Sequence, residues 1–256
     1  MAPQIAAARA VARGSKSHVG LDGSRIDLSA ANVTLDRPAS AILTVYVNGR
    51  VWEFTASYRD FGRDVAADSK IVLDEQFSFQ HGIVRAGSVE QSVFFPNGSS
   101  GEYVSTNFRI LTWEGRNYSV HTHVYDGSTT EAMAALDAFN IVETPDGIRM
   151  VRRQPTKAPY YKPPDLLKEI PEIGLLSIQQ LTKDVARTLP RWPGTAVRGG
   201  ELFVSGSGDG ANCGTAGFTL VGSSSVVIVM PDAGASSNAV VSSLSDLTVD
   251  WQAGSG

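Results

Sequence analysis

Residues 25–125 alternate apolar and polar side chains in short β-branched and aromatic runs, which are separated by Gly, Asn, Asp and Pro. A period of two residues places successive side chains on opposite faces of the backbone and is typical of half-buried β-strands. The clearest unit covers residues 42–54 around Asn48-Gly49, a dipeptide that accepts the two positive φ angles of a tight hairpin turn. The pattern therefore predicts a sheet built from antiparallel hairpins.

A second hairpin is predicted between Phe108 and Tyr125. Ser128 follows it and lies three residues before Glu131, the spacing of a capping box that satisfies free amides at the start of a helix. A short hairpin over residues 141–151 then completes the segment. We expect residues 20–152 to form one β-rich α+β domain with one packed helix.

The next segment, residues 153–193, is rich in proline, which cannot lie inside a helix or a central strand. We expect a stiff connector in which Tyr160 and Tyr161 are available to lie on a neighbouring surface. Apolar residues at helical spacing predict one helix over residues 174–189 within it. These residues are Leu175, Ile178, Leu181, Val185 and Leu189.

Residues 194–256 are dominated by Gly, Ser, Ala and Val, with short apolar runs that predict strands over 201–205, 217–221, 225–230 and 246–251. We expect a small, acidic, Gly/Ser-rich β domain that is marginal alone and favours packing on a partner or on the first domain of its own chain. The fold class predicted for the whole chain is mainly β (α+β).

The two ends of the chain differ in charge. Residues 1–19 contain Arg9, Arg13 and Lys16 and no acid, whereas five acids and no Lys or Arg follow Arg198. We interpret residues 1–19 as a basic interaction arm that is complementary to the acidic end. The alternative is a frayed, solvated tail.

Composition excludes several classes of protein. Hydrophobic residues make up 42% and charged residues 19%, so the chain is expected to fold. The net charge of -4 argues against sequence-specific or general nucleic-acid binding, and the single cysteine rules out an intrachain disulfide. No segment reaches the roughly 18 apolar residues of a membrane helix. We expect an intracellular location at synthesis, with a virion as the later location.

His121 and His123 are the first candidates for chemistry, because two histidines at i, i+2 on a strand point to one side and can chelate a metal. A third ligand would be needed, and His81 or Asp126 are the nearest of suitable type. The alternative is two surface histidines on the polar face of their strand. Since hydrolase, phosphate-loop and zinc-protease motifs are missing, we expect no catalytic residue, no cofactor and no metal.

A basic arm, a β-rich domain, a stiff connector and a small acidic domain are typical of an assembly subunit. We therefore expect a non-enzymatic structural protein that binds copies of itself and other subunits of a larger assembly, with no membrane partner. A virion component, such as a tail or capsid accessory protein of a phage, is the example we favour. The residues expected to make contacts are Arg9, Arg13, Lys16, Tyr160 and Tyr161. The alternatives are a metal-dependent enzyme using His121 and His123, or a carbohydrate- or receptor-binding module at the C-terminal end.

Overall fold

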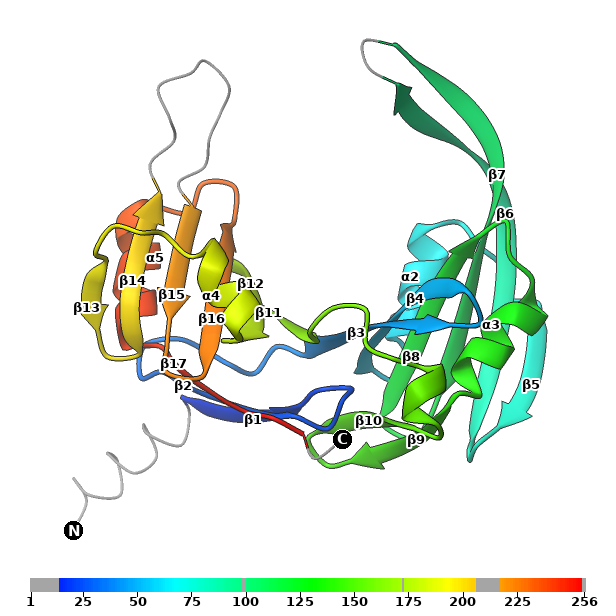
Figure 1. Cartoon of the computed structure of the whole chain (residues 1–256), viewed down its shortest axis with the longest axis horizontal. Coiled ribbons are helices and arrows are strands. Elements are labelled where there is room, and N and C mark those ends of the chain that lie inside the picture. Colours follow the sequence, from blue (N-terminus) through cyan, green and yellow to red (C-terminus); the bar gives the residue numbers. More distant parts are fainter. Residues whose placement is uncertain (1–13, 98–99, 172, 206–216, 255–256) are drawn as a thin grey trace. The chain divides into compact units, whose positions relative to one another are not determined.

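The computed structural model describes residues 14–97, 100–171, 173–205 and 217–254 (Figure 1). The chain is mainly β with large antiparallel sheets, which confirms the predicted class. Two compact units are present, and each is considered by itself: a continuous unit over residues 42–162, and a split unit that joins residues up to 41 with residues from 163. None of the helices in the described ranges is long and apolar enough to cross a membrane.

The continuous unit is built on a sheet of antiparallel strands. Its turn at Asn48-Gly49 has φ angles of 51° and 83°, so the predicted hairpin is confirmed. The second predicted hairpin is also present, with Phe108 opposite Tyr125. In spatial order the strands are β3 (Ala39–Val47), β4 (Arg50–Tyr58), β8 (Tyr118–Tyr125), β7 (Ser100–Glu114), β6 (Gly82–Asn97) and β5 (Glu75–Phe79).

Two helices pack on this sheet. In α2 (Phe61–Asp68), a Cβ on Gly62 would lie 2.0 Å from Thr112 Oγ1, so only glycine allows the helix to approach so closely. Helix α3 (Thr129–Leu136) begins with the predicted capping box. The Glu131 amide donates to Ser128 Oγ at 3.2 Å, and the Ser128 amide donates to Glu131 Oε2 at 2.7 Å.

The hairpin of β9 (Phe139–Thr144) and β10 (Gly147–Arg152) closes the core of the continuous unit, as the sequence predicts. Phe139 is fully buried against Phe54, with ring centroids 5.6 Å apart in an edge-to-face arrangement. Ile148 and Met150 are each 1% exposed. A 3-10 turn, η1 (Pro155–Lys157), follows β10.

The split unit contains a six-stranded and a three-stranded antiparallel arrangement. The first has the order β13 (Thr195–Val197), β14 (Gly200–Ser205), β15 (Gly217–Val221), β16 (Ser225–Pro231), β12 (Gly174–Gln180) and β11 (Asp165–Ile170). The second consists of β17 (Thr248–Gln252), β2 (Arg25–Ser29) and β1 (Ser15–Val19). Two helices, α4 (Lys183–Thr188) and α5 (Ser237–Asp246), complete it. The four strands predicted near the C-terminal end are therefore present.

The predicted helix over residues 174–189 is wrong. Residues 174–180 form β12, which pairs with β11 and β16, and helix α4 begins only after its cap at Thr182. Burial along β12 alternates: Leu176 and Ile178 are fully buried, whereas Leu175 is partly exposed. Because β11 and β12 belong to the sheet of the split unit, residues 153–193 do not form one extended connector.

The predicted basic arm over residues 1–19 is also wrong in its last five residues, which belong to a sheet. Arg9 and Arg13 lie outside the described residues, but Ser15–Val19 is strand β1 and pairs with β2. Strand β2 in turn pairs with β17, so Asp27 lies opposite Asp250. A division at residue 20 would separate these paired strands.

Candidate functional site

Strands β6 and β7 extend far beyond their neighbours in the sheet (Figure 1). The pairing of β5 with β6 ends at Ala86, and the pairing of β8 with β7 begins at Phe108. Beyond these points the two strands pair with each other as far as Asn97 and Ser100. We call this two-stranded ribbon, residues 88–97 and 100–107, the arm. At about 3.3 Å per residue it projects about 25 Å from the sheet.

The surface of the arm is unusual for a free ribbon. Tyr103 is 76% exposed and Val104 39% exposed, and Val93 and Phe94 pair with them in register. A two-stranded ribbon is marginally stable in water, and an unpaired strand edge is open to another chain. From Ser88 to Asn107 the sequence has no Lys or Arg, and the residues of kinds that protect such edges are limited to Glu90, Pro96 and Glu102. The arm is therefore a candidate surface for contact with another chain.

The root of the arm is firmly held. Val89 and Phe108 pack against the buried cluster of Ala66, Ile71 and Ile110 beside α2. The Asn107 amide donates to Asp126 Oδ1 at 2.9 Å, and the Asp126 amide donates to Asn107 O at 2.8 Å. Arg109 Nη1 donates to Glu75 Oε1 and to Thr129 Oγ1, both at 2.7 Å. These contacts hold the root of the arm in the sheet.

His121 and His123 lie on β8 as predicted, but their environments differ. His121 is 8% exposed under Phe61, with ring centroids 5.2 Å apart, so its interpretation as a surface residue is wrong. Burial lowers the pKa of His121 to about 4, and the charge of His123 acts in the same direction. His123 is exposed beside Phe108.

The residues needed to turn this pair into a metal site do not come together. Within the described ranges, no group of three or more His, Cys, Asp or Glu side chains is arranged to hold a metal ion. Asp126 is engaged with Asn107, and His81 lies in the turn between β5 and β6. The metal-dependent alternative therefore has no support in the described geometry.

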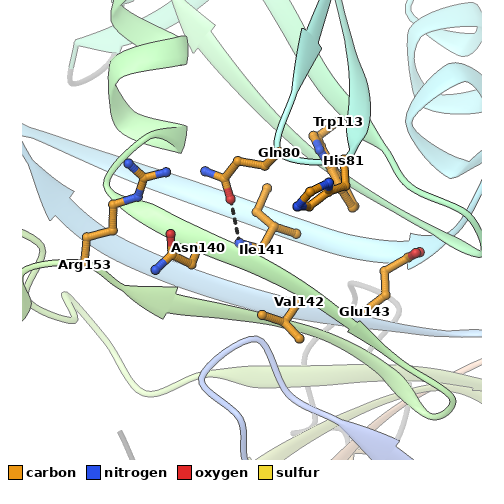
Figure 2. Close-up of a pocket in the computed structure, with 8 residues that line it drawn as sticks. All are labelled: Gln80, His81, Trp113, Asn140, Ile141, Val142, Glu143 and Arg153. Carbon is orange, nitrogen blue, oxygen red and sulfur yellow. Dashed lines mark hydrogen bonds between the residues drawn. The ribbon is translucent and has the colours of Figure 1, made fainter.

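A pocket of about 470 Å³ lies beside that turn (Figure 2). Gln80 acts there as a substitute strand partner: its Nε2 donates to Phe139 O at 2.8 Å, and its Oε1 accepts from the Ile141 amide at 2.9 Å. The Glu143 carboxylate accepts hydrogen bonds from three backbone amides, those of Arg116, Asn117 and Tyr118. The pocket is lined by Gln80, His81, Trp113, Asn140, Ile141, Val142, Glu143 and Arg153.

The contacts in this pocket serve structure. Gln80 and His81 adopt left-handed φ angles of 44° and 62°, which cost about 1 kcal/mol or more per residue, and the two bonds of Gln80 help to offset that cost. We conclude that the hydrogen bonds around this pocket hold the β9–β10 hairpin against the neighbouring turns.

The two tyrosines expected to make contacts have different roles. The Arg152 guanidinium lies 4.0 Å from the centre of the Tyr160 ring, and the backbone on either side of Tyr160 bonds to β3. Tyr160 is therefore used within its own unit, whereas Tyr161 is 65% exposed. Lys16, the third described candidate, is exposed on β1.

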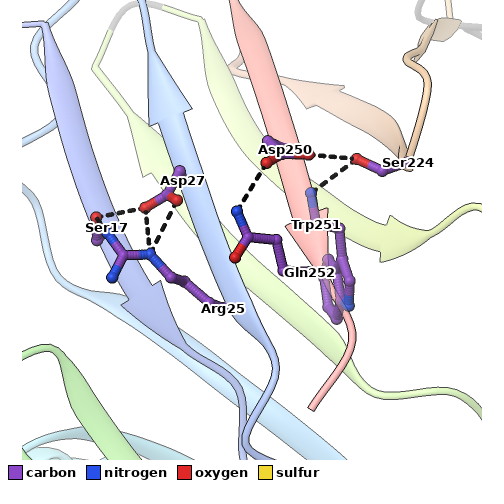
Figure 3. Close-up of polar contacts among 7 residues, drawn as sticks. All are labelled: Ser17, Arg25, Asp27, Ser224, Asp250, Trp251 and Gln252. Carbon is purple, nitrogen blue, oxygen red and sulfur yellow. Dashed lines mark hydrogen bonds and ion pairs between the residues drawn. The ribbon is translucent and has the colours of Figure 1, made fainter. Parts of the chain in front are cut away.

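Several of the acids near the C-terminal end have partners within the split unit. Asp250 accepts hydrogen bonds from Ser224 Oγ and Gln252 Nε2, both at 3.0 Å (Figure 3). On the neighbouring strand β2, Asp27 forms an ion pair with Arg25. Asp246 binds Arg198 at 2.8 Å and also the amide of Ala31. Of the acids after Arg198, Asp246 is thus partly neutralised within the split unit by its ion pair with Arg198.

Comparison with models of known protein families, with curated proteins and with solved structures finds no match for this chain. The functional argument therefore depends on the geometry. The arm is the candidate feature that the sequence reasoning missed. One signal was present, since residues 91–101 carry no charge at all in a chain with 19% charged residues.

Proposed function

We propose that this chain is a non-enzymatic structural subunit of a large homo-oligomeric assembly, and that the arm forms contacts between subunits. The observation that supports the proposal is the extension of β6 and β7 beyond β5 and β8. A ribbon with exposed Tyr103 and Val104 and two open edges gains stability when another chain covers it. A virion component, such as a phage tail or capsid accessory protein, is the class of assembly that we favour.

The arm can be shortened without disturbing its root. Along an antiparallel ladder, hydrogen-bonded and non-hydrogen-bonded residue pairs alternate, so every second pair is of the same type. The pair Gln91–Thr106 is therefore of the same type as the pair Asn97–Ser100, which a two-residue turn joins at the end of the arm. We would delete residues 92–105 and join the two strands by Asn-Gly, the turn that closes β3 and β4. The bonds between Asn107 and Asp126 are retained.

Sedimentation velocity of the intact and shortened chains over a range of concentrations tests the proposal. We expect the intact chain to form species larger than the 27.2 kDa monomer and the shortened chain to remain monomeric and folded. Circular dichroism and thermal unfolding check the fold of the shortened chain. If both chains form the same large species, the arm is not the contact.

A further inference from the structure

Helix α2 covers a part of the sheet whose side chains are polar. Two rows of directly paired residues lie there on one face of β4, β8 and β7, and all but the partly buried Thr55 are buried. A sheet face that is covered by a helix is normally apolar. We call these six residues the polar floor: Thr55, His121 and Thr112 in one row, and Ser57, Ser119 and Glu114 in the other.

The first three residues of α2 each contact the polar floor. The Phe61 ring lies on the ring of His121, and the Gly62 amide donates to Ser119 Oγ at 3.3 Å. Arg63 donates to both oxygens of Glu114, with Nε at 2.6 Å from Oε1. Polar bonds and one ring contact therefore hold the start of the helix.

The helix gains little from apolar burial. Its buried residues are Gly62 and Ala66, and Ala66 packs with Ile71 and Ile110. The side chain of Asp60 at the N-cap forms no capping bond. An eight-residue helix is not stable by itself, and short elements with few buried apolar contacts are those that open locally in a folded protein.

Two atoms of the polar floor are buried and have no hydrogen-bond partner among the described residues. They are His121 Nδ1 and Thr112 Oγ1, on residues that pair directly across β8 and β7. A buried polar atom without a partner destabilises the arrangement that buries it. Exposure of the floor to solvent would remove this cost.

The closed position of α2 also disfavours a charge on His121. Burial is the main cause of its lowered pKa of about 4, and the charge of His123 is the second cause. The first turn of α2 lies over the imidazole, and the partial positive charge of a helix N-terminus acts in the same direction.

The acids around His121 do not offset this effect. Glu114 is held by Arg63 and by Arg85, and the Tyr58 hydroxyl donates to Asp64 at 2.7 Å. Among the described residues, no carboxylate raises the pKa of His121. The charged and titratable groups on the surrounding elements are Glu53 and Tyr58 of β4, Arg59 and Asp60 before α2, Arg63, Asp64 and Asp68 of α2, Arg85 of β6, Glu114 of β7 and His123 of β8.

We propose that α2 detaches from the polar floor as a local unit, separately from the sheet, when His121 takes up a proton. Detachment removes Ala66 from the cluster with Ile110, on which Val89 and Phe108 at the root of the arm also pack. Acid therefore loosens the root of the arm. This is a property of the single chain and does not depend on the assembly function proposed above.

Hydrogen exchange of the full chain, followed by mass spectrometry of peptides, tests the proposal. We expect peptides from residues 61–71 to exchange faster than those of β8 at every pH, with little dependence on added urea. From pH 7 to 4.5, their exchange, corrected for the intrinsic rate, should rise by about fiftyfold, because His121 titrates at about 4 when closed and near 6.5 when exposed.

Two substitutions separate the trigger from the attachment. His121→Leu should abolish the rise with acid, and His123→Leu should retain most of it, because His123 is the smaller cause. Arg63→Gln should speed exchange of residues 61–71 by about tenfold at both pH values and leave the rise with acid intact, because it removes the bonds to Glu114. Arg59→Gln, an exposed residue before α2, is the control and should change neither.

The outcomes decide each part of the proposal. If residues 61–71 exchange at the rate of β8 and with the same urea dependence, α2 opens only with the whole unit and the proposal is wrong. If they open locally but equally at pH 7 and 4.5, His121 is not the trigger and the proposal is overturned. If acid opens α2 but residues 105–110 keep their protection, the link to the arm is wrong. Sedimentation of the shortened chain tests the assembly function separately, so failure of one proposal leaves the other standing.

Discussion

We expect the buried histidine of β8 to make the continuous unit sensitive to acid. His121 is 8% exposed beneath Phe61, and burial lowers its pKa from 6.5 to about 4. Between these two values the unfolded chain binds a proton that the folded chain excludes. The contribution of His121 to stability is therefore complete above pH 6.5 and is lost as the pH falls towards 4.

The size of this effect follows from the pKa difference. A shift from 6.5 to about 4 corresponds to about 3 kcal/mol of unfolding free energy, which is a large share of the roughly 5–15 kcal/mol of a typical domain. His121→Leu removes the titrating group and keeps an apolar side chain under Phe61. Between pH 6.5 and 4, we expect the unfolding free energy of this variant to fall by about 3 kcal/mol less than that of the wild type.

The measurement has to separate the two units, since His18 of the split unit is also buried with its pKa lowered to about 4. Urea titration followed by pulsed hydrogen exchange and mass spectrometry reports on peptides from β8 and from β1 independently. His123→Leu, on the same strand but exposed, is the control and should retain most of the pH dependence, because burial is the larger cause of the lowered His121 pKa and the charge of His123 the smaller. Equal pH dependence in His121→Leu and wild type would refute the reasoning.

Three further predictions follow from the same geometry. Tyr103→Ser should weaken self-association by about 2 kcal/mol, or about thirtyfold, because a ring that is 76% exposed is lost from the contact. Sedimentation measures this change, and Val72→Ser, which alters an exposed residue outside the arm, should have no effect. A fragment of residues 42–162 should give a dispersed NMR spectrum, whereas in a fragment of residues 20–152 the part before residue 39 should be disordered, and order there would contradict the unit boundary. Ser128→Ala should lower the stability of the continuous unit by about 1 kcal/mol in urea, and an unchanged midpoint would show that the cap is not needed.

Features that depend on neighbouring residues were predictable from the sequence. The hairpin at Asn48-Gly49 and the helix cap at Ser128 each need only a few adjacent residues, and both are confirmed. The alternation of residues 147–152 likewise identifies one buried and one exposed face. Local pattern was sufficient for the class of fold and for most of the strands.

Features that depend on distant pairing were not predictable. Strand β2 pairs with β17, more than two hundred residues later in the chain, and both strands belong to the split unit. The spacing of Leu175 and Ile178 fits one face of a helix, but the buried residues of β12 are Leu176 and Ile178, two residues apart. Only the neighbouring strands β11 and β16 decide between the two patterns.

The same limit applies to the candidate site. The burial of His121 comes from Phe61, which α2 places over β8, and nothing near residue 121 in the sequence indicates it. The arm could not be predicted for a related reason, because the sequence does not show where β5 stops pairing with β6 or where β8 starts pairing with β7. The lack of charged residues over 91–101 is the one local sign of the arm in the sequence.

The molar mass of the intact chain in solution tests the central claim most directly. Light scattering after size-exclusion chromatography, at several concentrations and at low salt, measures it without any substitution. The account predicts species of several subunits, at multiples of the 27.2 kDa chain mass, which dissociate as salt is raised. A single 27.2 kDa species at every concentration would contradict an assembly function for this chain.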